Sequence, residues 1–123
     1  MARILVIDDE RAIRDVLKRL FQLDGHVVVV AENGHAGLVQ LRRQAVDLVV
    51  TDMTMPVKGG IETLAEVRRD FPAMKVIAMC GGWPGSALDP LMLAHDLGAR
   101  REIRKPFEIE EMRRAAREVL AET

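Results

Sequence analysis

Residues 4–9 read Ile-Leu-Val-Ile-Asp-Asp, four consecutive aliphatic side chains that run directly into two acids. A short apolar run without polar alternation predicts a strand that is buried on both faces, as in the middle of a parallel sheet. The acids then mark the point where this strand leaves the interior. This stretch therefore predicts both the kind of sheet and the end of the sheet that carries polar chemistry.

Similar runs recur along the chain and alternate with segments of helical spacing. The predicted strands are Ile4–Ile7, His26–Ala31, Leu48–Thr51, Val76–Met79 and Arg101–Arg104. The predicted helices are Arg11–Leu23, a segment capped by Asn33 and ending near Gln44, Ile61–Asp70, about Leu88–Leu97, and Phe107–Glu122. Such β–α alternation predicts a doubly wound α/β fold of three layers, with helices on both faces of a parallel five-stranded sheet. The last strand is less apolar, as is typical of a sheet edge.

Length and composition narrow the class of protein. The chain has 123 residues, 49% hydrophobic and 30% charged, with a formal net charge of -1. From this length we expect a single domain over residues 1–123 with no output domain. Because proteins that bind nucleic acid are usually basic, the net charge predicts no direct binding of nucleic acid. No apolar run approaches the roughly 20 residues that span a bilayer, and we expect no signal peptide before the first strand. The single cysteine, Cys80, fits a reducing compartment, so we expect a cytoplasmic protein without membrane contact.

Chemistry-bearing residues follow the predicted strands. Asp8 and Asp9 follow the first strand, Asp52 follows the third, Cys80 the fourth and Lys105 the fifth. Ligands of open α/β sheets bind beyond the carboxyl ends of the strands. We therefore expect three aspartates and one lysine to converge on one rim of the sheet.

Three carboxylates close together repel one another, so such a cluster favours a bound cation. Oxygen ligands select a hard ion, and a few carboxylates with water suit Mg²⁺ better than a full Ca²⁺ cage. A lysine on the same rim can hold an anion that arrives with the metal. Transfer of a phosphoryl group to a carboxylate needs that carboxylate to attack phosphorus, and a metal ion and an ammonium that neutralise the phosphoryl oxygens. The predicted rim combines a carboxylate, a site for Mg²⁺ and an ammonium.

Three motifs at these strand ends resemble one known family. They are Val6-Ile-Asp-Asp-Glu10, Asp52-Met-Thr-Met-Pro-Val-Lys-Gly-Gly60 and Lys105-Pro-Phe107. The chain resembles, over essentially its whole length, the receiver domain of two-component response regulators, especially the single-domain chemotaxis type. This resemblance implies a flavodoxin-like fold with strand order 2-1-3-4-5.

The resemblance also implies a metal site and a phosphoacceptor. Asp52 would form an aspartyl phosphate and contribute to the metal shell. Asp9 would be the main ligand of Mg²⁺, which Mn²⁺ can replace, and Asp8 would hold a metal-bound water. The backbone carbonyl of Thr54 would complete the protein's share of the shell.

Other residues would contact the phosphoryl group or set its lifetime. The resemblance implies that Lys105 contacts the phosphoryl group, together with Cys80 and Gly81 at the end of the fourth strand. Pro106 would follow a cis peptide bond that orients Lys105. The positions of Thr54 and Gly82 tune the lifetime of the phosphoryl group in this family.

Two positions depart from the family pattern. Cys80 stands where the family has Ser or Thr, and a thiol is a weaker hydrogen-bond donor than a hydroxyl. Glu102 stands three residues before Lys105, where many receivers carry an aromatic side chain that turns inward on activation. Both departures concern the conformational response rather than the transfer step.

The sequence is compatible with two functions from different classes. The first is a switch, not an enzyme, that takes a phosphoryl group from a sensor histidine kinase or a histidine phosphotransfer protein. It would signal to another protein through the fourth helix, fifth strand and fifth helix, as a monomer or weak dimer. The second is a pseudo-receiver, a binding module uncoupled from phosphorylation, supported only by Cys80 and Glu102. A phosphatase with an aspartate nucleophile is disfavoured, because Thr54 occupies the position of its second aspartate.

Overall fold

The computed structural model describes residues 1–53, 59–81 and 90–122, in which strands and helices alternate. The strands are β1 (Arg3–Ile7), β2 (Val27–Ala31), β3 (Leu48–Asp52), β4 (Val76–Cys80) and β5 (Arg101–Arg104). The helices are α1 (Arg11–Leu23), α2 (Gly34–Arg43), α3 (Gly60–Asp70), α4 (Pro90–Asp96) and α5 (Ile109–Ala121). No helix in the described ranges has both the length and the apolar character that crossing a membrane requires.

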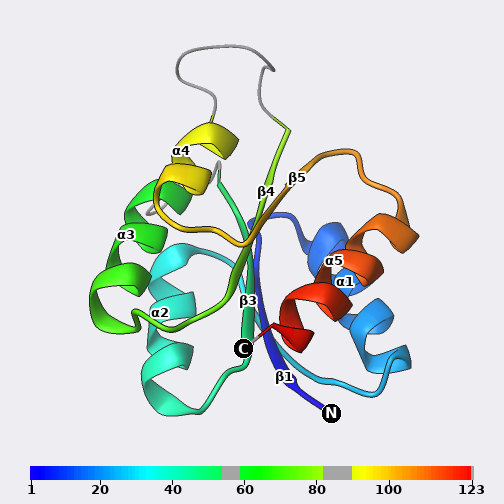
Figure 1. The fold of residues 1–123 in the computed structure, drawn as a ribbon. Helices are drawn as coiled ribbons and strands as arrows, with labels where there is room; N and C mark the ends of the chain where they lie inside the picture. The colour runs from blue at the N-terminus through cyan, green and yellow to red at the C-terminus, as the bar shows by residue number, and fades with distance from the viewer. Residues whose placement is uncertain (54–58, 82–89, 123) are drawn as a thin grey trace.

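All neighbouring strands are parallel, and their order in the sheet is β2-β1-β3-β4-β5. Helices α2, α3 and α4 cover one face of the sheet, and α1 and α5 cover the other (Figure 1). The predicted doubly wound fold and its strand order are confirmed. The less apolar strand β5 lies at an edge of the sheet, as its composition predicted.

Two apolar cores, one on each face of the sheet, explain why the strand sequences do not alternate with polar residues. Leu5 and Ile7 point to the core beneath α2 and α3, whereas Ile4 and Val6 point to the core beneath α1 and α5. Successive side chains of a strand face opposite sides, so a central strand needs apolar residues at every position. All five residues of β3 and of β4 are buried.

Several predicted helix boundaries differ from the structure by one or two residues, and two of these differences have a clear physical cause. Helix α5 begins at Ile109 rather than Phe107, because Glu108 is still extended (φ −82°, ψ 146°) and forms the N-cap. Phe107 packs against the α1/α5 core from outside the helix, which is why its apolar side chain fits the helical pattern. Helix α4 ends at Asp96, one residue early, because Gly98 turns the chain with φ +89°. The start predicted near residue 88 lies outside the described ranges.

An ion pair joins the end of α1 to α5. The guanidinium of Arg113 donates to both carboxylate oxygens of Asp24, from Nε at 3.0 Å and from Nη2 at 2.5 Å. The hydrogen bond to Arg113 is the main reason why the pKa of Asp24 lies below its usual value of 3.8. A carboxyl group with a lowered pKa stabilises the fold above its ordinary pKa and loses that contribution as the pH falls through its lowered pKa.

This sign gives a testable prediction for Arg113→Gln. The substitution should reduce the urea midpoint at pH 6, and the difference from the parent protein should shrink as the pH falls below about 4. Glu110→Gln is the matched control, because it removes the other carboxylate that Arg113 contacts and leaves Asp24 paired. A difference between parent and Arg113→Gln that stays constant down to pH 3 would contradict this account.

Candidate functional site

The parallel pairing of β1 and β3 brings two acids together. Ile7 lies opposite Thr51 in this pair, so Asp8 and Asp52, the next residues on each strand, lie side by side. Asp8 is fully buried, and Asp52 is 3% exposed. They lie at the carboxyl ends of the strands on either side of the point where the strand order reverses, which is where ligands of open α/β sheets bind.

Asp8 is held by hydrogen bonds on its backbone and on both carboxylate oxygens. Its N–H donates to the carbonyl of Ala31 at 3.1 Å, and its own carbonyl accepts from Arg14 Nη1 at 2.8 Å. Its Oδ1 accepts from the backbone N–H of Glu10 at 2.8 Å, and its Oδ2 accepts from Lys105 Nζ at 2.7 Å. A buried carboxylate satisfied in this way has one well-defined orientation.

Lys105 bridges the two buried acids. Its Nζ lies 2.7 Å from Asp8 Oδ2 and 3.6 Å from Asp52 Oδ1, and its side chain is only 14% exposed. Burial alone would lower the pKa of Lys105, but the hydrogen bond to Asp8 and attraction by Asp52, Asp8 and Glu10 outweigh burial, so the pKa is raised. The ammonium therefore stays charged between the two carboxylates, where it is placed to hold an anionic group.

The chain around Lys105 fixes the position of this side chain. Its backbone N–H donates to the carbonyl of Cys80 at 2.8 Å, and the Lys105–Pro106 peptide bond is cis. Gly81 follows β4 alongside Lys105, since a Cβ built on Gly81 would lie 3.9 Å from Lys105 Cβ. Cys80 is fully buried in the core beneath α2 and α3. Gly82, predicted to tune the phosphoryl lifetime, lies outside the described residues.

Acidic side chains after β1 form a group that suits a metal ion. Carboxylate oxygens of Asp8, Asp9 and Glu10 all lie within 4.8 Å of one another, with Asp8 buried and the other two exposed. Oxygen donors of this kind fit a hard divalent ion such as Mg²⁺. The structure thus adds Glu10 to this group, whereas the sequence predicted Asp52 there together with Asp8 and Asp9. Asp52 is linked to the group through Lys105, and Thr54 lies outside the described residues.

Sequence reasoning also missed Arg14, whose guanidinium reaches the carbonyl of Asp8. An arginine early in an amphipathic helix is usually solvated, so composition gives no signal for this contact. The position of Arg14 in the sequence does give a signal for this contact, because long side chains of a helix point back toward its N-terminus. Arg14 lies one turn into α1, directly after the acidic turn at residues 8–10.

Glu102, which occupies the position of the family's aromatic residue, has a partner on α4. Its Oε1 lies 2.8 Å from Nδ1 of His95, and the two side chains are 26% and 74% exposed. This contact links β5 to α4 at the surface. An exposed pair of this kind is usually worth only ~0–1 kcal/mol, so this contact adds little to the stability of the fold.

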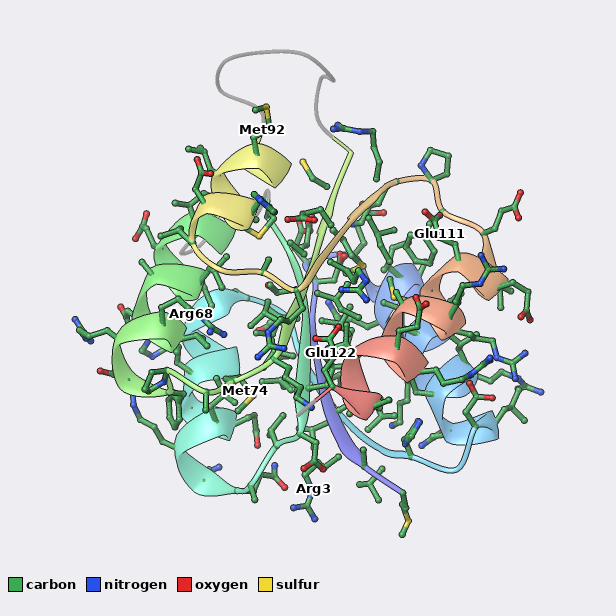
Figure 2. The ribbon with its side chains drawn as sticks, in the orientation of Figure 1. Arg3, Arg68, Met74, Met92, Glu111 and Glu122 are labelled. Carbon is green, nitrogen blue, oxygen red and sulfur yellow. The ribbon has the colours of Figure 1, made fainter. Side chains whose placement is uncertain are left out.

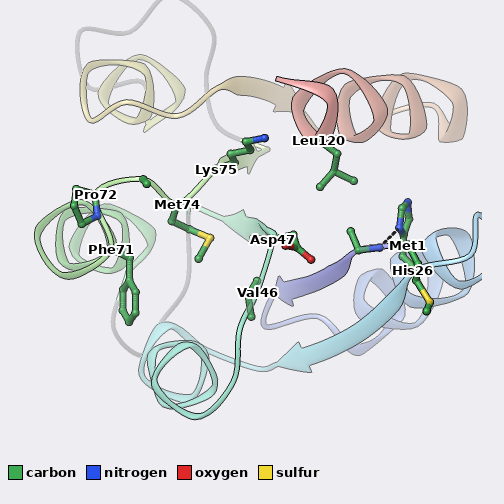
Figure 3. Close-up of a pocket in the computed structure, with 11 residues that line it drawn as sticks. Met1, His26, Val46, Asp47, Phe71, Pro72, Met74, Lys75 and Leu120 are labelled. Atoms are coloured by element: carbon green, nitrogen blue, oxygen red, sulfur yellow. Dashed lines mark hydrogen bonds between the residues drawn. The ribbon is translucent and has the colours of Figure 1, made fainter. Parts of the chain in front are cut away.

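A groove of about 700 Å³ lies at the opposite end of the sheet (Figure 3). It is lined by residues that directly precede strands, among them Ala2, His26, Asp47 and Lys75. Among the described residues of its lining, Asp47 is the only one with an acidic side chain, and its Oδ2 accepts a hydrogen bond from the backbone N–H of Arg3. The cluster of carboxylates and ammonium, rather than this groove, therefore identifies the candidate functional site.

Comparison with known proteins agrees with this fold and identifies a family. The family model for the response regulator receiver domain matches residues 4–117. The transcriptional regulatory protein CpxR of Klebsiella pneumoniae is 36% identical over 120 residues, which cover 98% of this chain and 50% of that protein. The sporulation initiation phosphotransferase F of Bacillus subtilis is 33% identical over 118 residues, covering 96% of this chain and 93% of that protein.

Solved structures give the same result. A response regulator receiver domain protein from Clostridium thermocellum superposes with a TM-score of 0.87 at 34% identity, over 98% of this chain and 94% of that one. The response regulator TrrA of Thermotoga maritima, solved in complex with Mg²⁺ and BeF, superposes with a TM-score of 0.83 at 29% identity, over 97% of this chain and 99% of that one.

The chain belongs to the response regulator receiver domain family of two-component systems. Members of this family are phosphoacceptor switches that bind Mg²⁺ at an acidic pocket and interact with histidine kinases or phosphotransfer proteins. The chain spans about half the length of CpxR and most of the length of the sporulation phosphotransferase.

Proposed function

We propose that this domain accepts a phosphoryl group on the carboxylate of Asp52 in a Mg²⁺-dependent step and passes the signal to a protein partner. One observation carries the proposal: the ammonium of Lys105 lies 2.7 Å from Asp8 and 3.6 Å from Asp52, beside an acidic group suited to a metal ion. A nucleophilic carboxylate, a cation site and a buried ammonium are thereby combined at one strand-end crevice.

In the transfer step a carboxylate oxygen of Asp52 attacks the phosphorus of the donor. A new O–P bond forms, and the bond from phosphorus to the donor's leaving atom breaks. That atom is a histidine nitrogen of the kinase or phosphotransfer protein, and it keeps the electron pair of the broken bond. Lys105 exchanges its contact with Asp52 for a contact with a phosphoryl oxygen, whose charge it neutralises.

Asp9 would be the main metal ligand, Asp8 would hold a metal-bound water, and Asp52 and the carbonyl of Thr54 would complete the shell. Glu10, the third acid of the group, would add negative charge at the rim. When bound, Mg²⁺ or Mn²⁺ neutralises the phosphoryl oxygens and so favours their approach to Asp52. The Mg²⁺ and BeF bound to the similar TrrA support this assignment.

The conformational response depends on residues around β4 and β5. Cys80 and Gly81 would sense the phosphoryl group at the end of β4, with Cys80 in place of a hydroxyl donor. Thr54 and Gly82 would set the lifetime of the phosphoryl group. Glu102 links this region to α4 through His95, so the Glu102–His95 contact takes the place of the aromatic switch found in many receivers.

The signal would leave through the face made by α4, β5 and α5. Figure 2 shows Met92 on α4 and Glu111 on α5, the two helices that flank β5. Met92 is 60% exposed and Leu93 is 38% exposed, so α4 presents apolar area that a protein target could cover. A sensor histidine kinase or a histidine phosphotransfer protein would deliver the phosphoryl group, and the domain would act as a monomer or weak dimer in the cytoplasm.

The test is intact-mass spectrometry after incubation with acetyl phosphate, with Mg²⁺ or with a chelator. We expect the mass of one added phosphoryl group with Mg²⁺, and none with the chelator or in Asp52→Asn. Asp96→Asn is the matched control, because it removes an exposed aspartate at the end of α4 that belongs neither to the acidic group nor to the ion pairs of Lys105. A protein that binds Mg²⁺ but gains no phosphoryl group would favour the alternative, a pseudo-receiver that binds its partner without phosphorylation.

A further inference from the structure

Arg14 contacts the acidic turn from outside the set of residues assigned above. Its Nη1 donates to the carbonyl of Asp8 at 2.8 Å, and its backbone N–H donates to the carbonyl of Glu10 at 3.1 Å. Arg14 therefore binds the carbonyl groups on both sides of Asp9. The backbone bond to Glu10 would form in any helix that starts here, whereas the bond to Asp8 depends on the arginine side chain.

The bond from the guanidinium fixes the plane of the peptide that joins Asp8 to Asp9. On the other side of this turn, Asp8 Oδ1 accepts the backbone N–H of Glu10 at 2.8 Å. The backbone that carries Asp9 is thus held at residue 8 by Arg14 and at residue 10 by Asp8. Because Asp9 is exposed, these backbone contacts matter more for its position than packing of its side chain does.

The guanidinium leaves the carboxylates available. Among the ion pairs of the described residues none includes Arg14, and its side-chain hydrogen bond goes to a backbone oxygen. An arginine paired with Asp9 or Glu10 would compete directly with a metal ion. An arginine on the Asp8 carbonyl orients the ligands without occupying them, as outer-shell partners of metal sites do.

We infer that Arg14 is a positioning residue that holds the Asp8–Asp9–Glu10 turn in the geometry that binds a divalent metal. The inference rests on the proposed function, since it assigns Arg14 a role in the Mg²⁺ step that precedes phosphorylation of Asp52. Arg14 acts through Asp9 and touches neither the metal nor the phosphoryl group.

Two substitutions separate positioning from charge. Arg14→Gln removes the bond to Asp8 and one positive charge. Arg11→Gln removes the same charge from the same helical turn, but the side chain of Arg11 is solvent-exposed and its ion pair is with Asp15. Loss of charge alone would tighten Mg²⁺ binding in both variants, so only loss of positioning weakens it in Arg14→Gln.

The measurement is the Mg²⁺ dissociation constant by isothermal titration calorimetry, with folding checked by circular dichroism. We expect Arg14→Gln to bind Mg²⁺ about 10-fold more weakly than Arg11→Gln, at the lower end of what outer-shell partners contribute. Arg14→Lys, which keeps a charged donor, should restore most of the affinity. With acetyl phosphate, the Mg²⁺ concentration for half-maximal rate should rise while the rate at saturating Mg²⁺ stays close to that of the parent.

Equal Mg²⁺ affinities in Arg14→Gln and Arg11→Gln would overturn the inference, as would absence of Mg²⁺ binding by the parent protein. Failure of the proposed function looks different. In that case the parent binds Mg²⁺ but Asp52 gains no phosphoryl group, and the calorimetric comparison still decides the role of Arg14. If Arg14→Gln does not fold, Arg14→Met takes its place in the same comparison with Arg11→Gln, because Met keeps an aliphatic stem but donates no hydrogen bond to the carbonyl of Asp8.

Discussion

Lys105→Met is expected to destabilise the metal-free domain and to make its stability depend strongly on Mg²⁺. The substitution removes the ammonium 2.7 Å from the fully buried Asp8 carboxylate and 3.6 Å from Asp52. Removing one partner of a buried ion pair lowers the free energy of unfolding by about 3 kcal/mol or more, because the other partner's charge stays buried without compensation. The same loss removes a cation that competes with the metal, so Mg²⁺ affinity should rise.

Urea unfolding with a chelator and with excess Mg²⁺ measures both effects. A ligand that binds the folded state stabilises it more when its concentration is large relative to its dissociation constant. Because Lys105→Met should bind Mg²⁺ more tightly, the same Mg²⁺ concentration should stabilise it more than the parent. Lys75→Met is the matched control, since Lys75 is a half-buried lysine at the other end of the sheet, bonded to the carbonyl of Glu122. Equal Mg²⁺ responses in parent and Lys105→Met would contradict the bridging role of Lys105.

Gly60→Ala is expected to have the second large effect. A Cβ at Gly60 would lie 2.4 Å from Met53 Cα and 2.5 Å from the carbonyl oxygen of Asp52. Both are backbone atoms, which cannot rotate aside as a side chain can, so α3 or the end of β3 must move. Overpacking of this kind costs about 3 kcal/mol. The shift falls on Asp52, which we propose as the phosphoacceptor, so phosphorylation should slow as well.

Gly59→Ala provides a close control one residue away. A Cβ at Gly59 meets nothing within 4 Å, and its backbone (φ −61°, ψ 162°) suits an L-residue. Gly59 is the N-cap of α3, where Ala is less favourable than Gly, but Ala also restricts the unfolded chain. Because these two effects oppose each other, we expect the free energy of unfolding to stay within about 1 kcal/mol of the parent value. Urea unfolding and the initial rate with acetyl phosphate would be compared for both variants. A similar loss in both would show that the close approach at Gly60 is not the cause.

The sheet could be predicted from sequence because its strands are buried on both faces. Runs such as Ile4–Ile7 and Leu48–Thr51 leave no polar alternation, and acids follow both of them at one end of the sheet. A parallel sheet brings such strand ends together whatever the details of packing. Asp8, Asp52 and Lys105 could therefore be placed in one crevice before any distance was known.

Other features depend on contacts that a linear pattern does not contain. Phe107 fits a helical stripe but packs beside the core before α5 begins, so the predicted helix starts too early. Arg14 and His95 lie outside the apolar stripes of their helices, and their contacts with Asp8 and Glu102 depend on side-chain direction. The sequence predicts the third helix from Ile61, whereas the structure begins α3 at Gly60 and shows that Gly60, unlike Gly59, lies against the backbone of β3.

The central claim is that the carboxylate of Asp52 is the acceptor, rather than one of its acidic neighbours. The most direct measurement treats the unmodified domain with acetyl phosphate and Mg²⁺, and then reduces it with borohydride, which converts an aspartyl phosphate to homoserine. Peptide sequencing by mass spectrometry locates the converted residue without altering the site by mutation. The account predicts homoserine at position 52 alone, and only when Mg²⁺ is present. Homoserine at position 8 or 9, or a phosphoryl adduct that leaves position 52 unconverted, would contradict it.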